Sequence, residues 1–197
     1  LRSGEERQKF WSLVNFVCNS LRIEHGYAGL SPVLPYDCDR YMSFEYPLSQ
    51  QFTGLMIDSV AYGHTRELKN HSIKGVNWLT IVGNELLNKL GGPDKVQQQL
   101  HIPGVQVHPY RNGLIVQAGD YPSLGAEDEG LPPLYVAVNR VFKPIRIADP
   151  DQLHYHMPDR ESFDKEATLR WYARFDVDEP PAQHDVLRAR GCRPTSR

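Results

Sequence analysis

Gly-Val-Asn-Trp-Leu-Thr-Ile-Val-Gly-Asn-Glu-Leu-Leu-Asn-Lys-Leu-Gly-Gly, residues 75–92, is the stretch with the clearest structural pattern in this chain. Its uninterrupted apolar run, residues 76–82, is typical of a buried strand. A short helix over 84–90 is expected next, and Gly91 and Gly92 suit a helix end that needs a positive φ angle. The stretch carries no catalytic, metal-binding or phosphate-binding motif, so we expect it to be a structural element.

Apolar residues on either side of this stretch recur at the spacing of helices or strands. A first helix is expected over residues 3–21, because Ser3 and Glu6 form a capping box and apolar residues follow at helical intervals. Ser162 is expected to cap the last helix. Further helices are expected over 47–60, 93–100, 133–142 and 163–175, and further strands over 27–34, 105–108, 114–118 and 145–147.

The strands over 105–108 and 114–118 predict a β-hairpin. They flank Pro109-Tyr110-Arg111-Asn112-Gly113, whose Asn-Gly pair suits the positive φ angles of a tight turn. Strands that do not alternate strictly with helices indicate the α+β class, here a mainly antiparallel sheet packed against several helices. One domain is expected over residues 1–176, followed by a flexible polar tail over 177–197.

The composition excludes several functional classes. The chain has 197 residues, of which 40% are hydrophobic and 23% charged, as in ordinary soluble globular domains. A formal net charge of −2 provides no overall basic field for non-specific nucleic-acid binding. Three cysteines without a Cys-x-x-Cys pair argue against a disulfide framework and favour a reducing compartment. No apolar run reaches the roughly 20 residues that a membrane-spanning helix needs.

The sequence shows no catalytic constellation. It lacks Gly-x-Ser-x-Gly, Gly-x-Gly-x-x-Gly and Gly-x-x-x-x-Gly-Lys-Ser/Thr motifs. Cys18 lies near the apolar side of the first helix, where core packing explains it better than nucleophilic chemistry. We therefore predict a protein that is not an enzyme, with no catalytic, cofactor-binding or metal-binding residues. The alternative is a small metal-assisted hydrolase that uses His154, His156 and a carboxylate.

The acidic loop over residues 119–132 is the main candidate for a recognition surface. Asp120, Glu127, Asp128 and Glu129 concentrate negative charge on this one connection. Such a loop suits a basic nucleic-acid-binding groove on another protein, and a merely solubilising loop is the competing interpretation. Nearby in sequence, Tyr110-Arg111 adds an aromatic and basic pair of the kind that anchors protein interfaces.

Several short motifs follow one another in a distinctive order. They are His25-Gly26-Tyr27-Ala28-Gly29-Leu30, the stretch 75–92, Gly113–Gly119, Pro122–Gly125, Leu131–Tyr135, Lys143-Pro144 and Leu169–Phe175. In this order and spacing they resemble the type VI secretion immunity family described as immunity to VRR-NUC nucleases (TsiV). The resemblance covers about residues 1–176. Since that family's usual chain extends well upstream, we expect this sequence to be its C-terminal part.

The resemblance implies an inhibitor without catalytic activity. It would bind a cognate toxin, a nuclease of restriction-endonuclease-like type, and cover its DNA-binding or catalytic face. Because such a toxin kills in the cytoplasm, the inhibitor is expected there too. No cofactor and no direct contact with nucleic acid or membrane are expected. An adaptor domain without a toxin partner is the second alternative.

Overall fold

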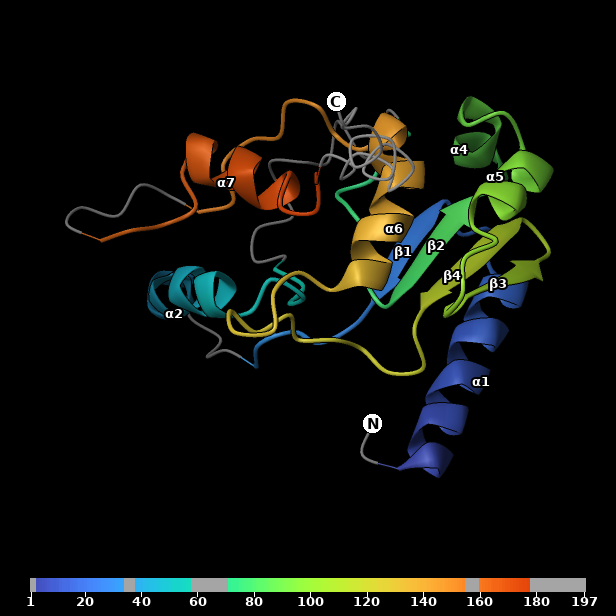
Figure 1. Cartoon of the computed structure of the whole chain (residues 1–197), viewed down its shortest axis with the longest axis horizontal. Coiled ribbons are helices and arrows are strands. Elements are labelled where there is room, and N and C mark those ends of the chain that lie inside the picture. The colour runs from blue at the N-terminus through green and yellow to red at the C-terminus, as the bar shows by residue number, and fades with distance from the viewer. Residues whose placement is uncertain (1–2, 34–37, 58–70, 155–159, 178–197) are drawn as a thin grey trace, which may run out of the picture.

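A four-stranded antiparallel sheet forms the centre of the molecule (Figure 1). The computed structural model describes residues 3–33, 38–57, 71–154 and 160–177. In these ranges the strands are β1 (His25–Ala28), β2 (Leu79–Gly83), β3 (Val105–Tyr110) and β4 (Gly113–Ala118), in the spatial order β1-β2-β4-β3. The predicted α+β class with a mainly antiparallel sheet is therefore confirmed.

Strand β2 is the buried strand that the apolar run predicted: it is one of the two inner strands, and all five of its residues are buried. It begins later than the predicted residue 76, because side chains take up the backbone hydrogen bonds there. The Trp78 amide donates to Asn77 Oδ1 at 2.8 Å, and the Asn77 amide donates to Thr80 Oγ1 at 3.1 Å. The neighbouring strand β1 ends at Ala28 and not at residue 34, since Gly29 packs directly against the Asn77 side chain.

The predicted hairpin is present, but the reason given for its turn is wrong. Neither Asn112 nor Gly113 has a positive φ angle; in the described ranges His71 is the one non-glycine residue that does. Gly113 is instead required by close packing, because a Cβ atom there would lie 2.2 Å from the Val82 carbonyl oxygen. Strand β3 also continues beyond residue 108 through Pro109, which an edge strand tolerates because the missing N–H is not needed for pairing.

Four helices pack around this sheet: α1 (Gly4–Ser20), α4 (Asn84–Lys89), α5 (Pro93–Gln99) and α6 (Pro133–Phe142). Helix α1 has the predicted capping box, in which the Glu6 amide donates to Ser3 Oγ and Glu6 accepts from the Ser3 amide. Helix α4 ends as predicted at two glycines, Gly91 and Gly92, with φ angles of 96° and 98°. The stretch 75–92 therefore gives a buried strand and a short helix, as its pattern indicated.

A second, smaller hydrophobic cluster lies between α2 (Cys38–Gln51) and α7 (Lys165–Tyr172), at the left in Figure 1. The prediction of a helix over 47–60 is wrong: the helix begins well before Pro47 and ends before Gly54, and residues 58–60 lie outside the described ranges. Helix α7 begins after Asp164, whose side chain accepts from the Ala167 amide at 2.7 Å, so Ser162 is not the cap. Residues 178–197, the predicted tail, are also outside the described ranges.

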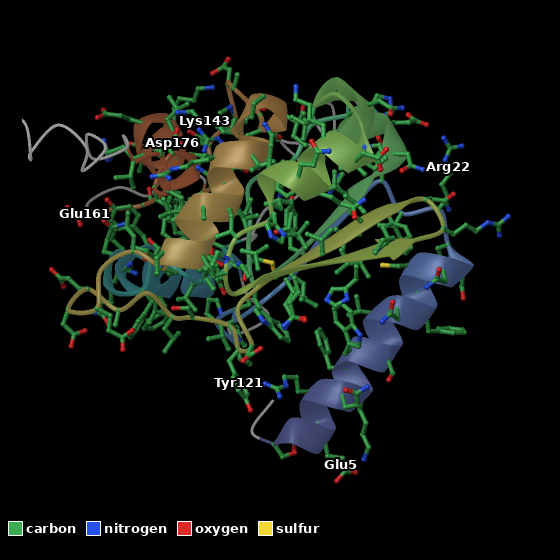
Figure 2. All side chains as sticks on the ribbon, turned by 45° about the vertical axis from the view of Figure 1, so that its right-hand side comes forward. Glu5, Arg22, Tyr121, Lys143, Glu161 and Asp176 are labelled. Atoms are coloured by element: carbon green, nitrogen blue, oxygen red, sulfur yellow. The ribbon has the colours of Figure 1, made fainter. Side chains whose placement is uncertain are left out.

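Residues 145–147 do not form the predicted strand. A 3-10 helix (Lys143–Ile145) follows α6 directly, and a single parallel bridge then joins Arg146 to Ile73. Arg146 also binds Asp176, which follows α7. Its guanidinium donates to both Asp176 oxygens at 2.8 and 2.7 Å, and Asn139 and Lys143 bind the same carboxylate (Figure 2).

This ion pair gives a prediction for the pH dependence of stability. Hydrogen bonds from Arg146 hold the pKa of Asp176 well below its usual range. The carboxylate therefore stabilises the folded state above its unfolded-state pKa of about 4, and this contribution is lost as the pH falls further. We expect Asp176→Asn to lower the free energy of unfolding at pH 7 by about 2 kcal/mol.

The measurement is urea unfolding of both proteins between pH 7 and pH 3.5. The difference between them should stay constant down to about pH 5 and shrink below that value. Glu161→Gln is the control, because Glu161 is an exposed acid (Figure 2). A difference that does not depend on pH would contradict the assigned role of Asp176.

Candidate protein-binding surface

The acidic loop, residues 119–132, is fixed against the end of α2 by backbone hydrogen bonds. The Thr53 amide donates to the Gly125 carbonyl at 2.9 Å, and the Gly54 amide donates to the Leu124 carbonyl at 2.7 Å. Phe52 and Ala126 form an isolated antiparallel β-bridge. Next to this bridge, the Glu127 amide donates to the Gln51 carbonyl at 3.1 Å. Figure 1 shows the loop folded against this part of the chain. The loop is therefore a fixed part of the surface.

Three consecutive acids form the exposed tip of this loop. Glu127, Asp128 and Glu129 are all exposed, on a turn in which the Glu129 and Gly130 amides both donate to the Ala126 carbonyl. In the part of the chain that the structure describes, no lysine or arginine forms an ion pair with these three carboxylates. We call residues 127–129 the acidic tip. Its charge is held in place and is available to a partner.

A groove between α2 and α7 adjoins the acidic tip. It encloses about 170 Å³, which is small for a metabolite-binding pocket and suits a single side chain. Gln51 follows the lining residue Gln50, and its carbonyl accepts from the Glu127 amide of the tip at 3.1 Å. The residues that line it are Tyr46, Ser49, Gln50, Thr53, Ala167, Arg170, Trp171 and Arg174.

Arg174 brings positive charge to this groove. Its guanidinium lies 3.9 Å from the centroid of the Trp171 ring, Nε donates to the Thr53 carbonyl, and Nη1 donates to the Trp171 carbonyl. Among the described residues no carboxylate pairs with it. Burial is the main reason that the pKa of Arg174 falls to about 9, so the side chain is still charged at pH 7. The groove thus offers an aromatic wall and a cation without a counter-charge.

Asp120 and Arg111, two other predicted contact residues, lie beyond opposite ends of β4. Asp120 is exposed at the far end of β4, where its backbone carbonyl accepts from Arg7 and the neighbouring Tyr121 stacks under the same guanidinium (Figure 2). Arg111 is exposed at the turn of the hairpin, at the opposite end of this six-residue strand and roughly 17 Å away.

The prediction that Tyr110 is a surface contact residue does not agree with the structure, because its side chain lies in the core. It is 8% exposed, and its hydroxyl donates to the Ile23 carbonyl at 2.9 Å. Burial raises the pKa of Tyr110 above its ordinary value. Since β3 continues through Pro109, Tyr110 pairs with Gly113 inside the sheet instead of lying in an exposed turn. It cannot serve as a surface anchor.

His154, from the alternative hydrolase interpretation, is buried and has no free ring nitrogen. The Phe163 amide donates to Nδ1 at 3.2 Å, so Nδ1 carries the lone pair. Nε2 therefore carries the proton and donates to Glu45 Oε2 at 2.9 Å. Both side chains are buried, which makes this pair a link between α2 and the segment before α7. His156 lies outside the described residues.

Two further features could carry catalytic or metal-binding chemistry: Cys18 and a cluster of one histidine and two glutamates. Cys18 is fully buried, and burial raises the pKa of its thiol, so the core-packing interpretation is confirmed. One group in the described ranges, Glu24, His71 and Glu85, has side chains close enough to share a metal ion. No sequence motif marks this group, because its three members are far apart in the chain.

The structure described so far is an α+β fold with three exposed acids, residues 127–129, on a loop fixed by backbone hydrogen bonds. Among solved structures, the Pseudomonas aeruginosa T6SS protein PA0821 is similar, with a TM-score of 0.80 and 30% sequence identity. The similarity covers 93% of this chain and 52% of that one, so the chain spans about half the length of this relative. No curated protein matches.

A family model described as TsiV, type VI immunity for VRR-NUC, matches residues 1–175. The chain belongs to this family of type VI immunity proteins, as the order of its motifs indicated. In the described ranges, no helix has both the length and the apolar character needed to cross a membrane.

The His154–Glu45 pair gives a prediction for stability. We expect His154→Ala to lower the free energy of unfolding by about 3–4 kcal/mol, because it leaves a buried carboxylate unpaired and removes an edge-on contact with Phe163. Urea unfolding at pH 7 measures this change. The matched control is His101→Ala, at an exposed histidine, which should change stability by less than about 0.5 kcal/mol. Equal stabilities of the two variants would contradict a structural role for His154.

Proposed function

We propose that this chain binds a VRR-NUC toxin through the acidic tip and the adjoining groove, and thereby covers the toxin's DNA-binding or catalytic face. The observation that carries the proposal is the arrangement of residues 127–129, three exposed carboxylates without a described cationic partner on a backbone fixed by hydrogen bonds. The family assignment supplies the class of partner. Binding and inhibition, without catalysis, are the whole of the proposed activity.

Electrostatics support this choice of surface. A nuclease must present positive charge to the phosphates of DNA, and that same face attracts carboxylates on a competing protein. The chain as a whole has a formal net charge of only −2, so the attraction has to come from a local cluster. Because the tip is already fixed in the free protein, little conformational entropy is lost on binding.

The groove supports selectivity for one toxin. A single toxin side chain fits its volume of about 170 Å³, and a carboxylate there would pair with Arg174, which has no acidic partner among the described residues. A basic toxin surface with an acidic residue at one position would therefore be preferred over a uniformly basic surface. The groove and the tip lie side by side, so one interface can use both.

We place the protein in the cytoplasm, where a DNA-cleaving toxin acts. The alternatives are a metal-assisted hydrolase and an adaptor without a toxin partner. The hydrolase loses support because both nitrogens of His154 are occupied. The adaptor interpretation keeps the same surface but predicts no binding to a VRR-NUC domain.

A triple charge reversal tests the proposal. We expect Glu127→Lys, Asp128→Lys and Glu129→Lys together to weaken binding to the cognate VRR-NUC domain by about 100-fold, roughly 3 kcal/mol, and to abolish protection of DNA from cleavage. Isothermal titration calorimetry measures the affinity and a plasmid-cleavage assay measures protection. Affinity for the unaltered chain should also fall as salt is raised from 50 to 500 mM, because surface charge pairs are screened.

The control is a triple reversal of dispersed exposed acids, Glu5→Lys, Asp94→Lys and Glu161→Lys, which changes the net charge equally. It should alter affinity by less than about threefold if local charge matters more than total charge. Circular dichroism is used to check that both variants are folded. Unchanged affinity in the folded 127–129 variant would refute the assigned surface, and no binding by the unaltered chain would favour the adaptor.

A further inference from the structure

We infer that Glu24, His71 and Glu85 form a binding site for a divalent transition-metal ion of the Zn²⁺ type. Their ligand atoms all lie within 4.8 Å of one another. His71 Nδ1 is 2.5 Å from Glu24 Oε1 and 3.4 Å from Glu85 Oε2, so one imidazole nitrogen points between two carboxylates. This site lies outside the proposed toxin-binding surface and is independent of the proposed function.

The backbone holds each of the three residues in place. The Glu24 carbonyl accepts from the Gly83 amide at 2.6 Å, at the end of the sheet where β1 begins and β2 ends. Glu85 lies in the first turn of α4, which begins directly after β2. His71 has a φ angle of 58°, which is uncommon for a residue other than glycine, and its carbonyl accepts from Lys89 at 2.8 Å. Three separate segments therefore converge on one point.

The distances suit a zinc-type ion. Bonds of about 2.0–2.2 Å from zinc to nitrogen and oxygen place tetrahedral ligand atoms about 3.4 Å apart. The His71–Glu85 separation already has this value, and the Glu24 carboxylate has to move by about 1 Å. With three protein ligands, water would complete the coordination.

The donor types also fit. Two carboxylates and one imidazole favour a zinc-type ion over Mg²⁺ or Ca²⁺, which prefer oxygen ligands only. Arg22 binds Glu85 through Oε1 and leaves Oε2 facing His71, as in sites where an outer residue orients a carboxylate ligand. Figure 2 shows Arg22 at the α4 end of the molecule. All three candidate ligands are partly exposed, so an ion can enter from solvent.

Zinc titration of the full, tag-free chain tests the inference after dialysis against a chelator. We expect one Zn²⁺ per chain by calorimetry, together with a rise in Tm, because an ion that binds only the folded state stabilises it. MgCl₂ at the same concentration should give a much smaller rise. His71→Ala and, separately, Glu85→Gln should weaken zinc binding at least tenfold. His101→Ala, at an exposed histidine outside the cluster, should leave it unchanged.

Two results would overturn the inference: no stoichiometric zinc binding by the unaltered chain, or equal zinc binding by the folded His71→Ala and Glu85→Gln variants. In either case the cluster is a hydrogen-bonded group of one histidine and two glutamates, without a metal site. If His71→Ala fails to fold, Glu85→Gln decides the question, because it keeps the His71–Glu24 contact intact. Toxin binding is measured separately, so its failure would not affect this result.

Discussion

The backbone contact between residues 51–54 and residues 124–127 is the constraint on which the proposed interface depends. Gly54 lies so close to the loop that a Cβ atom there would be 2.2 Å from the Ser123 carbonyl oxygen. The hydrogen bonds around it connect the end of α2 to a loop that starts from β4 and leads into α6. This contact, together with the binding of Asp176 by Arg146, connects the small cluster between α2 and α7 to the rest of the described structure. It also fixes the backbone of the acidic tip, and one of its residues, Thr53, lines the groove.

Local patterns in the sequence predicted the elements that depend on neighbouring residues. The buried strand, the capping box of α1 and the end of α4 at Gly91 and Gly92 all follow from short-range chemistry. Where tertiary packing determines the bounds of an element or the burial of a side chain, the local patterns gave wrong predictions. Pro47 looked like the start of a helix but lies inside α2. Tyr110 looked like part of an exposed turn, but β3 extends through Pro109 and places Tyr110 in the core.

The acidic tip could be predicted from the sequence but the groove could not, because the groove depends on contacts between residues far apart in the chain. Charge density marked the acidic tip, because exposure of three consecutive acids is almost assured in a folded protein. The groove beside it was not visible, since it needs α2 and α7, which are more than 100 residues apart. His154 was singled out by its spacing to His156, but its partner is Glu45, and no sequence motif relates the two. The Glu24, His71 and Glu85 cluster depends equally on distant segments.

The central feature of this account is charge whose position is fixed by backbone hydrogen bonds. We propose that the acidic tip meets the DNA-binding face of a nuclease, next to a groove whose cation, Arg174, pairs with no carboxylate among the described residues. The most direct test is hydrogen–deuterium exchange of the chain with and without its cognate VRR-NUC domain. The account predicts that the toxin slows exchange in peptides covering residues 46–54 and 119–132. Protection confined to α1 and the 105–118 hairpin, with no change in those peptides, would contradict it.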